Sequence, residues 1–229
     1  MLIILGIPTL SSEIHKDCMI SIMNLKDELK NQDIEIRVDF EVGSLITRCR
    51  QNILKRFYYS KADYLLFIDA DISNFEGCVP HMLKEIQKYK NSIIGITYRK
   101  KKYDISKVDH LSNNVFNGNL KNSILETIYT EENGIIKIKH LPTGFMMISR
   151  EVIENLLIAD PRKEFFNYFD CFIHEGKYLS EDYAFCQNVT DYIQGDILCY
   201  YTANLKHHIG NIYFDGSYKN YLIKLNSIL

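Results

Sequence analysis

The sequence lacks a surplus of either charge: 27 Lys and Arg residues face 29 Asp and Glu residues, and the net charge is −2. This balance indicates neither a nucleic-acid partner nor an acidic tail. No two of the six cysteines have the CxxC spacing of a zinc knuckle, so we expect reduced, mostly buried thiols rather than a zinc protein. Tryptophan is absent, and the aromatic residues are 16 tyrosines and 12 phenylalanines.

The sequence also lacks segments that target or anchor a chain. No apolar run approaches the roughly 20 residues that cross a bilayer, so we expect no transmembrane segment. Met1 leads directly into "LIILGIPTL", without the basic region or the cleavage site of a signal peptide. We therefore expect a cytoplasmic protein, in the host cytoplasm if the chain is viral. No repeat or low-complexity linker divides the sequence, which predicts a single domain over residues 1–229.

The first hundred residues alternate between strand and helix patterns. The order is 2–8 (strand), 16–32 (helix), 33–40 (strand), 45–59 (helix), 62–71 (strand), 77–90 (helix) and 92–98 (strand). This order predicts an α/β fold with a mostly parallel sheet that helices cover on both faces. Residues 1–100 would form a Rossmann-like nucleotide-binding half.

The second half, residues 101–229, has a more irregular pattern and predicts a smaller, mixed half. Residues 125–141 are expected to form a hairpin that turns at Glu132, Asn133 and Gly134. A strand that leads into a helix is expected over 144–157, and another helix over 180–193. Residues 196–210 have the pattern of strands.

The stretch "YLLFIDADIS" sends an apolar strand into two acids, Asp69 and Asp71, with Ala70 between them. Ligands of open parallel sheets bind at the carboxyl ends of strands, where these acids fall. Two close carboxylates repel each other unless a cation lies between them, and oxygen ligands suit Mg²⁺ or Mn²⁺. The pattern therefore indicates a metal–diphosphate site. The alternative is a solvated acidic turn.

A helix pattern before this strand contains an arginine on its apolar stripe. Arg50 shares the stripe with Ile46, Ile53 and Phe57, while Arg48 falls on the opposite face. A buried guanidinium needs an anionic partner. That partner could be a structural carboxylate, which the pattern favours for this residue alone, or a diphosphate.

The sequence "YLSEDYAFCQNV" places two acids at the start of a helix, where Ser180 is a candidate N-cap. Acids there can simply complement the helix dipole. However, Asp182 shares a stripe with Cys186 and Val189, so it should point inward as a candidate general base. Glu181 should point away from it by roughly 100°.

The vicinal histidines of "LKHHIG" could supply a metal ligand near the end of a strand. Alternation places His207 and His208 on opposite faces of that strand. Periodicity does not decide which of the two would bind.

Taken in this order, the motifs resemble those of an inverting GT-A fold glycosyltransferase, similar to small single-domain enzymes of large DNA viruses and bacteria. The resemblance covers nearly the whole chain. It is carried by "GIPT", "RQNILKRFYYSKADYLLFIDADI", "IIGITYRKK", "LPTGFMMISR", "LSEDYAFC" and "HHIG". Gln51 departs from the family's usual Asn after Arg50, and "YRKK" departs from its "YPxK" form.

The resemblance implies roles at matching positions. Asp71, Asp69 and His208 would bind Mn²⁺ or Mg²⁺, and Asp182 would deprotonate the acceptor hydroxyl. The residues that would contact or shape the site of the nucleotide-sugar donor are Pro8, Thr9, Arg50, Asp69, Ala70, Asp71, Lys100, Gly144 and Glu181. Among the basic residues of "YRKK", Arg99 and Lys101 remain alternatives to Lys100.

The implied reaction moves a sugar from a nucleoside-diphosphate sugar to an acceptor hydroxyl of a glycan or glycoconjugate. UDP is the expected nucleotide, and GDP remains open. Two other functions fit parts of the pattern: a sugar-nucleotide-binding domain without turnover, and a sugar nucleotidyltransferase. The second would carry a Gly-rich basic loop after the first strand, which "GIPTLSSEIHK" lacks.

Overall fold

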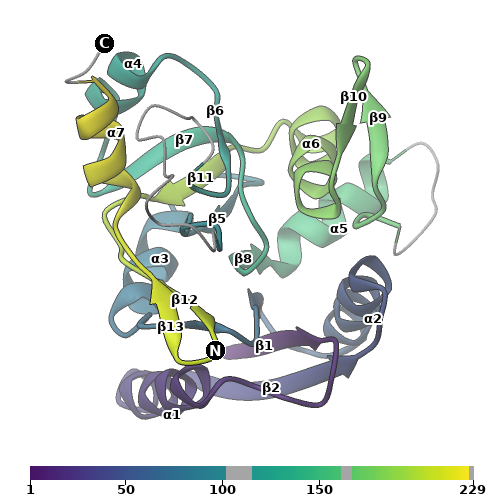
Figure 1. Cartoon of the computed structure of the whole chain (residues 1–229). Coiled ribbons are helices and arrows are strands. Elements are labelled where there is room, and N and C mark those ends of the chain that lie inside the picture. The colour runs from purple at the N-terminus through teal and green to yellow at the C-terminus, as the bar shows by residue number, and fades with distance from the viewer. Residues whose placement is uncertain (102–114, 161–166, 227–229) are drawn as a thin grey trace.

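The computed structural model describes residues 1–101, 115–160 and 167–226. Its main sheet has eight strands (Figure 1). In spatial order they are β2 (Glu35–Val42), β1 (Leu2–Thr9), β3 (Tyr64–Ile68), β8 (Phe145–Ser149), β5 (Ile93–Gly95), β11 (Ile197–Tyr200), β7 (Ile135–His140) and β6 (Asn119–Leu120). The pairings β1–β2, β1–β3 and β5–β11 are parallel. Strands β8 and β7 run against the other six, so the sheet is mostly parallel, as predicted.

Helices cover both faces of this sheet and bury two separate apolar clusters. The helices are α1 (Lys16–Lys30), α2 (Ile46–Tyr59), α3 (Cys78–Ile86), α4 (Ile124–Tyr129), α5 (Arg150–Ala159), α6 (Glu181–Ile193) and α7 (Tyr218–Asn226). Apolar residues of α1 and α3 pack on one face, and those of α2, α5 and α6 pack on the other. The α/β architecture predicted from the alternating patterns is confirmed.

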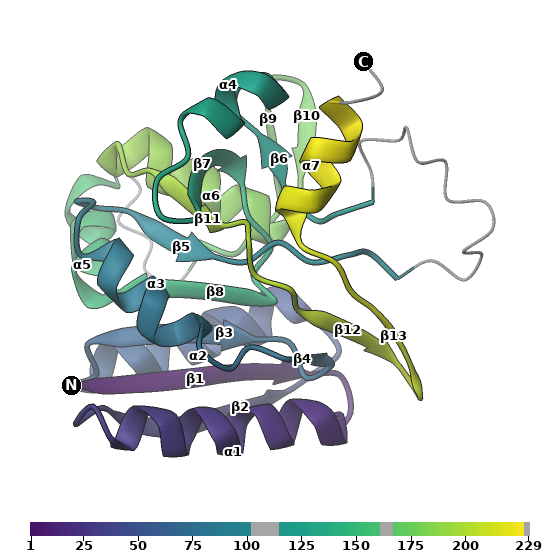
Figure 2. The same ribbon diagram turned by 90° about the vertical axis from the view of Figure 1, so that its left-hand side faces the viewer.

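Two small sheets complete the fold. Strand β12 (Lys206–Ile209) pairs on one side with β13 (Ile212–Phe214) and on the other with β4 (Ile72–Ser73). Figure 2 shows this hairpin beside β4, at the end of the main sheet where β3 terminates. Strands β9 (Phe172–His174) and β10 (Lys177–Leu179) form a separate hairpin. The first small sheet therefore brings the vicinal histidines to the chain that follows β3.

The hairpin predicted over residues 125–141 is wrong in its first arm, which forms α4. The sequence from Ser123 to Glu126 has the form of a capping box, and the Ser123 hydroxyl accepts a hydrogen bond from the Glu126 amide. The predicted turn is present, because Asn133 and Gly134 have φ angles of 53° and 79°. The second arm is β7, which pairs with β11 and β6.

Candidate active site

Asp69 and Asp71 lie at the carboxyl end of β3, in a tight turn that leads into β4. The Asp69 amide donates a hydrogen bond to the Gly144 carbonyl at 3.0 Å, and the Ile72 amide donates to the Asp69 carbonyl at 3.0 Å. The first bond holds the turn against the residue that precedes β8, and the second closes the turn itself. The acids therefore occupy the edge of the sheet where ligands of α/β proteins bind.

Arg50 connects the Asp69 carboxylate to the start of α6. Its Nη2 donates to Asp69 Oδ1 at 2.9 Å, and its Nε lies 3.6 Å from Glu181 Oε1. The guanidinium is almost fully buried, as the apolar stripe predicted. Burial disfavours its charge, but Asp69 and Glu181 outweigh that effect and raise the pKa of Arg50. Arg50 thus contacts both Asp69 and Glu181 and restrains the positions of these two carboxylates.

Tyr98, just beyond the end of β5, is a second partner of Asp69 that the sequence patterns did not single out. Its hydroxyl donates to Asp69 Oδ2 at 3.3 Å. Burial raises the pKa of Tyr98 well above its usual value, so the phenol keeps its proton. Tyr98 follows the carboxyl end of a strand, and this position in the sequence could have indicated it as a candidate site residue.

Gly144 leaves room for this pair of side chains. A Cβ atom at position 144 would lie 2.0 Å from the Tyr98 hydroxyl oxygen and 2.6 Å from Asp69 Oδ2. Residues larger than glycine would push both groups out of place.

We expect Gly144→Ala to lower the free energy of unfolding by about 1–3 kcal/mol and to weaken nucleotide binding, because it overpacks the Asp69–Tyr98 contact. Thermal unfolding and calorimetric titration measure the two effects. Gly43→Ala is a milder control, since its Cβ would meet one side-chain sulfur at 2.9 Å. Unchanged nucleotide affinity in Gly144→Ala would contradict this account of Gly144.

Asp71 has two partners, Lys101 and His207. Its carboxylate forms an ion pair with the Lys101 ammonium, and its Oδ1 lies 3.6 Å from His207 Nε2. His207 Nδ1 is 2.7 Å from the Arg99 carbonyl, so Nδ1 carries the proton and the Nε2 lone pair faces Asp71. Burial lowers the pKa of His207, which favours this neutral imidazole.

His208, the histidine expected to bind metal, points to the other face of β12. Its Nε2 is 2.7 Å from the Ser73 hydroxyl, and its Nδ1 is 3.9 Å from Asp17 Oδ2. Its ring stacks on that of His15 with centroids 3.9 Å apart. Ligand atoms of His15, Asp17 and His208 lie within 4.8 Å of one another, a cluster that no sequence spacing indicated.

The basic residues after β5 separate in the structure. Lys101 contacts Asp71, whereas Arg99 Nη1 donates to the Asp215 carbonyl at 3.3 Å. The Lys100 amide donates to the Val115 carbonyl at 2.9 Å. Lys101 is thus the residue of "YRKK" that pairs with Asp71.

Asp182 lies in the first turn of α6, next to Glu181. Burial raises the pKa of Asp182 to about 6, although the Ser180 hydroxyl and the Tyr183 amide both donate hydrogen bonds to it. Ser180 occupies the N-cap position, but its hydroxyl bonds Asp182 instead of capping the helix. A carboxylate with this pKa can hold or release a proton near neutral pH.

Pro8 and Thr9 end β1 at the same edge of the sheet. The Thr9 hydroxyl is buried and has no hydrogen-bond partner among the described residues. The Gly43 amide donates to the Thr9 carbonyl at 3.0 Å, which holds the loop after β2 against this strand end.

The charges around these side chains suit a divalent cation. The four acids Asp69, Asp71, Glu181 and Asp182 face two basic partners, Arg50 and Lys101. The site therefore carries an excess of two negative charges when all four acids are ionised. Asp71 and His207 offer oxygen and nitrogen ligands side by side, a set that suits Mn²⁺ better than Mg²⁺, which prefers oxygen ligands alone.

Comparisons with known proteins agree with this fold. Residues 47–157, just under half of the chain, match the sequence profile of Glycosyl transferase family 2. The chain matches no curated protein sequence. Among solved structures, A197 from STIV is similar, with a TM-score of 0.52 and 18% identity over 91% of this chain and 86% of that one.

GalNAc-T7, solved with UDP, GalNAc and Mn²⁺, is similar over 86% of this chain, with a TM-score of 0.50 and 12% identity. The match spans 42% of the GalNAc-T7 chain. The chain therefore has the GT-A fold, and its residues 47–157 resemble a Glycosyl transferase family 2 domain, which supports a glycosyltransferase. Among the described residues, no helix combines the length and the apolar character needed to span a bilayer.

Proposed function

We propose that the chain transfers a sugar from a nucleoside-diphosphate sugar, with UDP as the first nucleotide to test, to a hydroxyl group of a glycan or glycoconjugate. The observation that carries this proposal is the link from Asp69 through Arg50 to Glu181. It places the acids that follow β3 beside the start of α6, where Asp182 lies. A donor-binding group and a candidate base thereby meet at one edge of the sheet.

Asp71 and His207 would hold the divalent cation, with Asp69 oriented by Arg50 beside them. A bound Mn²⁺ or Mg²⁺ would neutralise charge on the departing nucleoside diphosphate. His207 replaces His208 in this proposal, because the Nε2 lone pair of His207 faces Asp71. In this structure the Lys101 ammonium group is paired with Asp71. Once a bound cation takes its place at Asp71, the ammonium group would be free to contact the diphosphate.

Asp182 would accept the proton of the acceptor hydroxyl as that oxygen attacks the anomeric carbon. The attack comes from the face opposite the nucleotide, so the product is inverted in a single displacement. No covalent intermediate with the protein is needed, and the residues contribute positioning and electrostatic stabilisation. The raised pKa of Asp182, about 6, supports its role as the base.

A hollow of about 260 Å³ beside Arg99 is our candidate for the acceptor site. Its lining includes the aromatic rings of Phe116 and Tyr221 and the polar side chains of Asp215 and Asn220. Aromatic rings beside hydrogen-bonding groups suit the mixed faces of a sugar. The bond from His207 Nδ1 to the Arg99 carbonyl connects this hollow to Asp71.

Calorimetric titration of UDP and GDP, each with and without Mn²⁺, tests the donor site. We expect one nucleotide to bind in a Mn²⁺-dependent manner, with at least about tenfold weaker binding in Asp71→Ala and in His207→Ala. His208→Ala is the matched control, and it should retain this binding. If neither nucleotide shows Mn²⁺-dependent binding, the proposed site is wrong.

The products separate the proposed function from its two alternatives. A transferase releases nucleoside diphosphate from the donor when an acceptor is present. A nucleotidyltransferase releases pyrophosphate from a nucleoside triphosphate and a sugar phosphate. A binding domain without turnover releases neither, although it binds the nucleotide.

A further inference from the structure

Strand β2 is an edge of the main sheet that nothing in the described part of the chain covers. It pairs with β1 along its whole length, from Leu2↔Glu35 to Thr9↔Val42, without a break in register. The strand contains neither proline nor glycine, and it has no bulge. Soluble proteins often protect a long edge strand with proline, a bulge or charged side chains, because its free amides and carbonyls can pair with another strand. Of these features β2 has only the charged side chains, which alternate with apolar ones.

The α1 side of β2 carries a row of apolar residues that α1 leaves partly uncovered. The register places Ile36, Val38 and Phe40 beside β1 residues that pack under α1. Val38 and Phe40 are nevertheless 38% and 46% exposed, and Val42 is 52% exposed. Figures 1 and 2 show α1 running along this face at the edge of the sheet.

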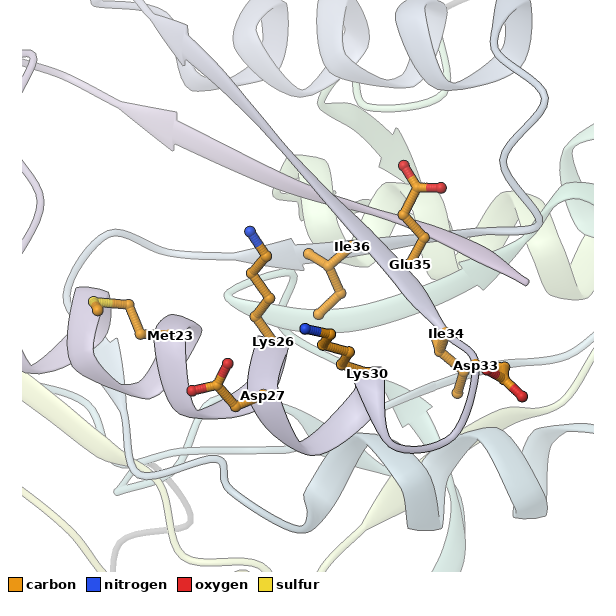
Figure 3. A pocket seen from close by; sticks show the side chains of 8 residues that line it. All are labelled: Met23, Lys26, Asp27, Lys30, Asp33, Ile34, Glu35 and Ile36. Carbon is orange, nitrogen blue, oxygen red and sulfur yellow. The ribbon is translucent and has the colours of Figure 1, made fainter.

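A hollow of about 880 Å³ lies between α1 and β2, as Figure 3 shows. Met23, Ile34 and Ile36 form its apolar lining, and Lys26 and Lys30 reach over it from α1. None of the acids at the candidate active site lines it. The hollow therefore adjoins the apolar row of β2 and is separate from the transfer site.

The α2 side of β2 is charged, and most of these charges are already paired. Arg56 of α2 contacts Asp39 at 2.8 Å and Glu41 at 2.6 Å. Arg37 has a 60% exposed side chain and lies 3.8 Å from Glu35, its one ion pair among the described residues. Arg37 is thus the basic group on this edge that is most available to a partner.

We infer that β2 pairs antiparallel with β2 of a second copy of the chain, about a two-fold axis at Val38. Residues directly opposite each other in an antiparallel pair lie on the same face of the sheet. In this register Arg37 lies opposite the partner's Asp39, and Ile36 lies opposite the partner's Phe40. Each of these contacts forms twice, because the interface is symmetric.

The same register brings apolar side chains to the hollow. Ile34 and Ile36, which line it, would lie opposite the partner's Val42 and the partner's Phe40. Glu35 would lie opposite the partner's Glu41, a like-charge pair that Arg56 offsets only in part, because Arg56 contacts both Asp39 and Glu41. A lipid surface fits this edge less well than a second copy does, because the strand itself carries Glu35, Asp39 and Glu41.

Cysteine cross-linking tests the register directly. In the proposed dimer the two Val38 Cα atoms lie about 4.5–5.5 Å apart, within the range that a disulfide spans. Oxidised Val38→Cys should therefore form a covalent dimer. Val42→Cys is the matched control: its two copies would lie about 27 Å apart, at about 3.4 Å per residue. The six natural cysteines are free, so oxidised wild type measures how much cross-linking they cause by themselves.

Sedimentation of the intact chain over a range of micromolar concentrations tests the association itself. We expect a wild-type dimer, about tenfold or more weakened in Arg37→Glu and retained in Arg37→Lys. Circular dichroism checks that each variant is folded. We expect all of them to fold, because the substituted side chains are exposed. The inference does not depend on glycosyl transfer. A wild type that stays monomeric, or a Val42→Cys variant that cross-links as well as Val38→Cys, would overturn it.

Discussion

Asp182→Asn is expected to lower the rate of sugar transfer by about 10²–10⁴-fold, the usual contribution of a positioned general base. Asparagine keeps the size of the side chain and its acceptor oxygen, so the Ser180 hydroxyl retains a partner. Donor binding should therefore change little, and the loss should fall on the chemical step. Single-turnover assays with saturating donor separate that step from binding.

The same role for Asp182 predicts a pH dependence. Because the pKa of Asp182 is raised to about 6, wild-type kcat/KM should increase as the pH rises through about 6 and the carboxylate becomes able to accept a proton. Asp191→Asn, an exposed substitution on the same helix, is the control and should keep this profile. A wild-type profile that stays flat from pH 5 to 7, taken as roughly one unit on either side of this pKa, would argue against Asp182 as the base.

Asp182→Asn should also stabilise the protein at neutral pH. The folded state binds the Asp182 proton more tightly than the unfolded state does, so ionised Asp182 lowers stability as the pH rises from about 4 to above 6. Asparagine carries no charge, and we expect a gain of about 1–2 kcal/mol at pH 7, with partial hydration of the site limiting the effect. Urea unfolding at pH 4 and pH 7 measures the difference in the free energy of unfolding between Asp182→Asn and wild type. This difference should vanish at pH 4.

Arg50→Met should be the most destabilising of these substitutions, with a loss of about 3 kcal/mol in the free energy of unfolding. It removes a buried cation and leaves Asp69 and Glu181 without their basic partner. The chain contains its own matched control, Arg56, on the same helix and also in contact with two acids. The Arg56 side chain is 43% exposed, so Arg56→Met should cost about 0–1 kcal/mol.

Denaturant unfolding of both arginine variants compares a buried ionic cluster with an exposed one on one scaffold. Nucleotide titration of the same proteins adds a functional measurement. Arg50→Met should weaken donor binding because Asp69 loses its orientation, whereas Arg56→Met should not. Equal losses of stability in the two variants would show that the burial of Arg50 does not matter.

Local patterns in the sequence were enough to predict the order of strands and helices in the first half, except for the two-residue strand β4. The apolar runs that became β1, β3 and β5 are short and sharply bounded, and the stripe with Ile53 and Phe57 correctly placed Arg50 inside. The insertion of β8 between β3 and β5, antiparallel to both, could not be predicted, because it depends on pairing between distant segments. The first arm of the predicted hairpin forms α4 instead of a strand, because Ser123 caps a helix there.

At the candidate site, the residue types could be predicted better than their contacts. The sequence placed Asp69 and Asp71 at the end of a strand, and it placed Asp182 on the inward stripe of a helix. It could not choose between His207 and His208, since alternation gives opposite faces without saying which one meets Asp71. That choice depends on how β12 pairs with β4, at a separation of more than a hundred residues.

The pairing of β12 with β4 also affects the order in which parts of the protein fold. Strand β4 directly follows Asp71, and its partner β12 begins at Lys206, so closing this contact means closing a very long loop. On a ribosome, the acids of the turn emerge long before the strand that carries His207. The turn after β3 therefore reaches its final geometry only when the last strands dock, and we expect the active site to be among the slowest regions of the protein to form.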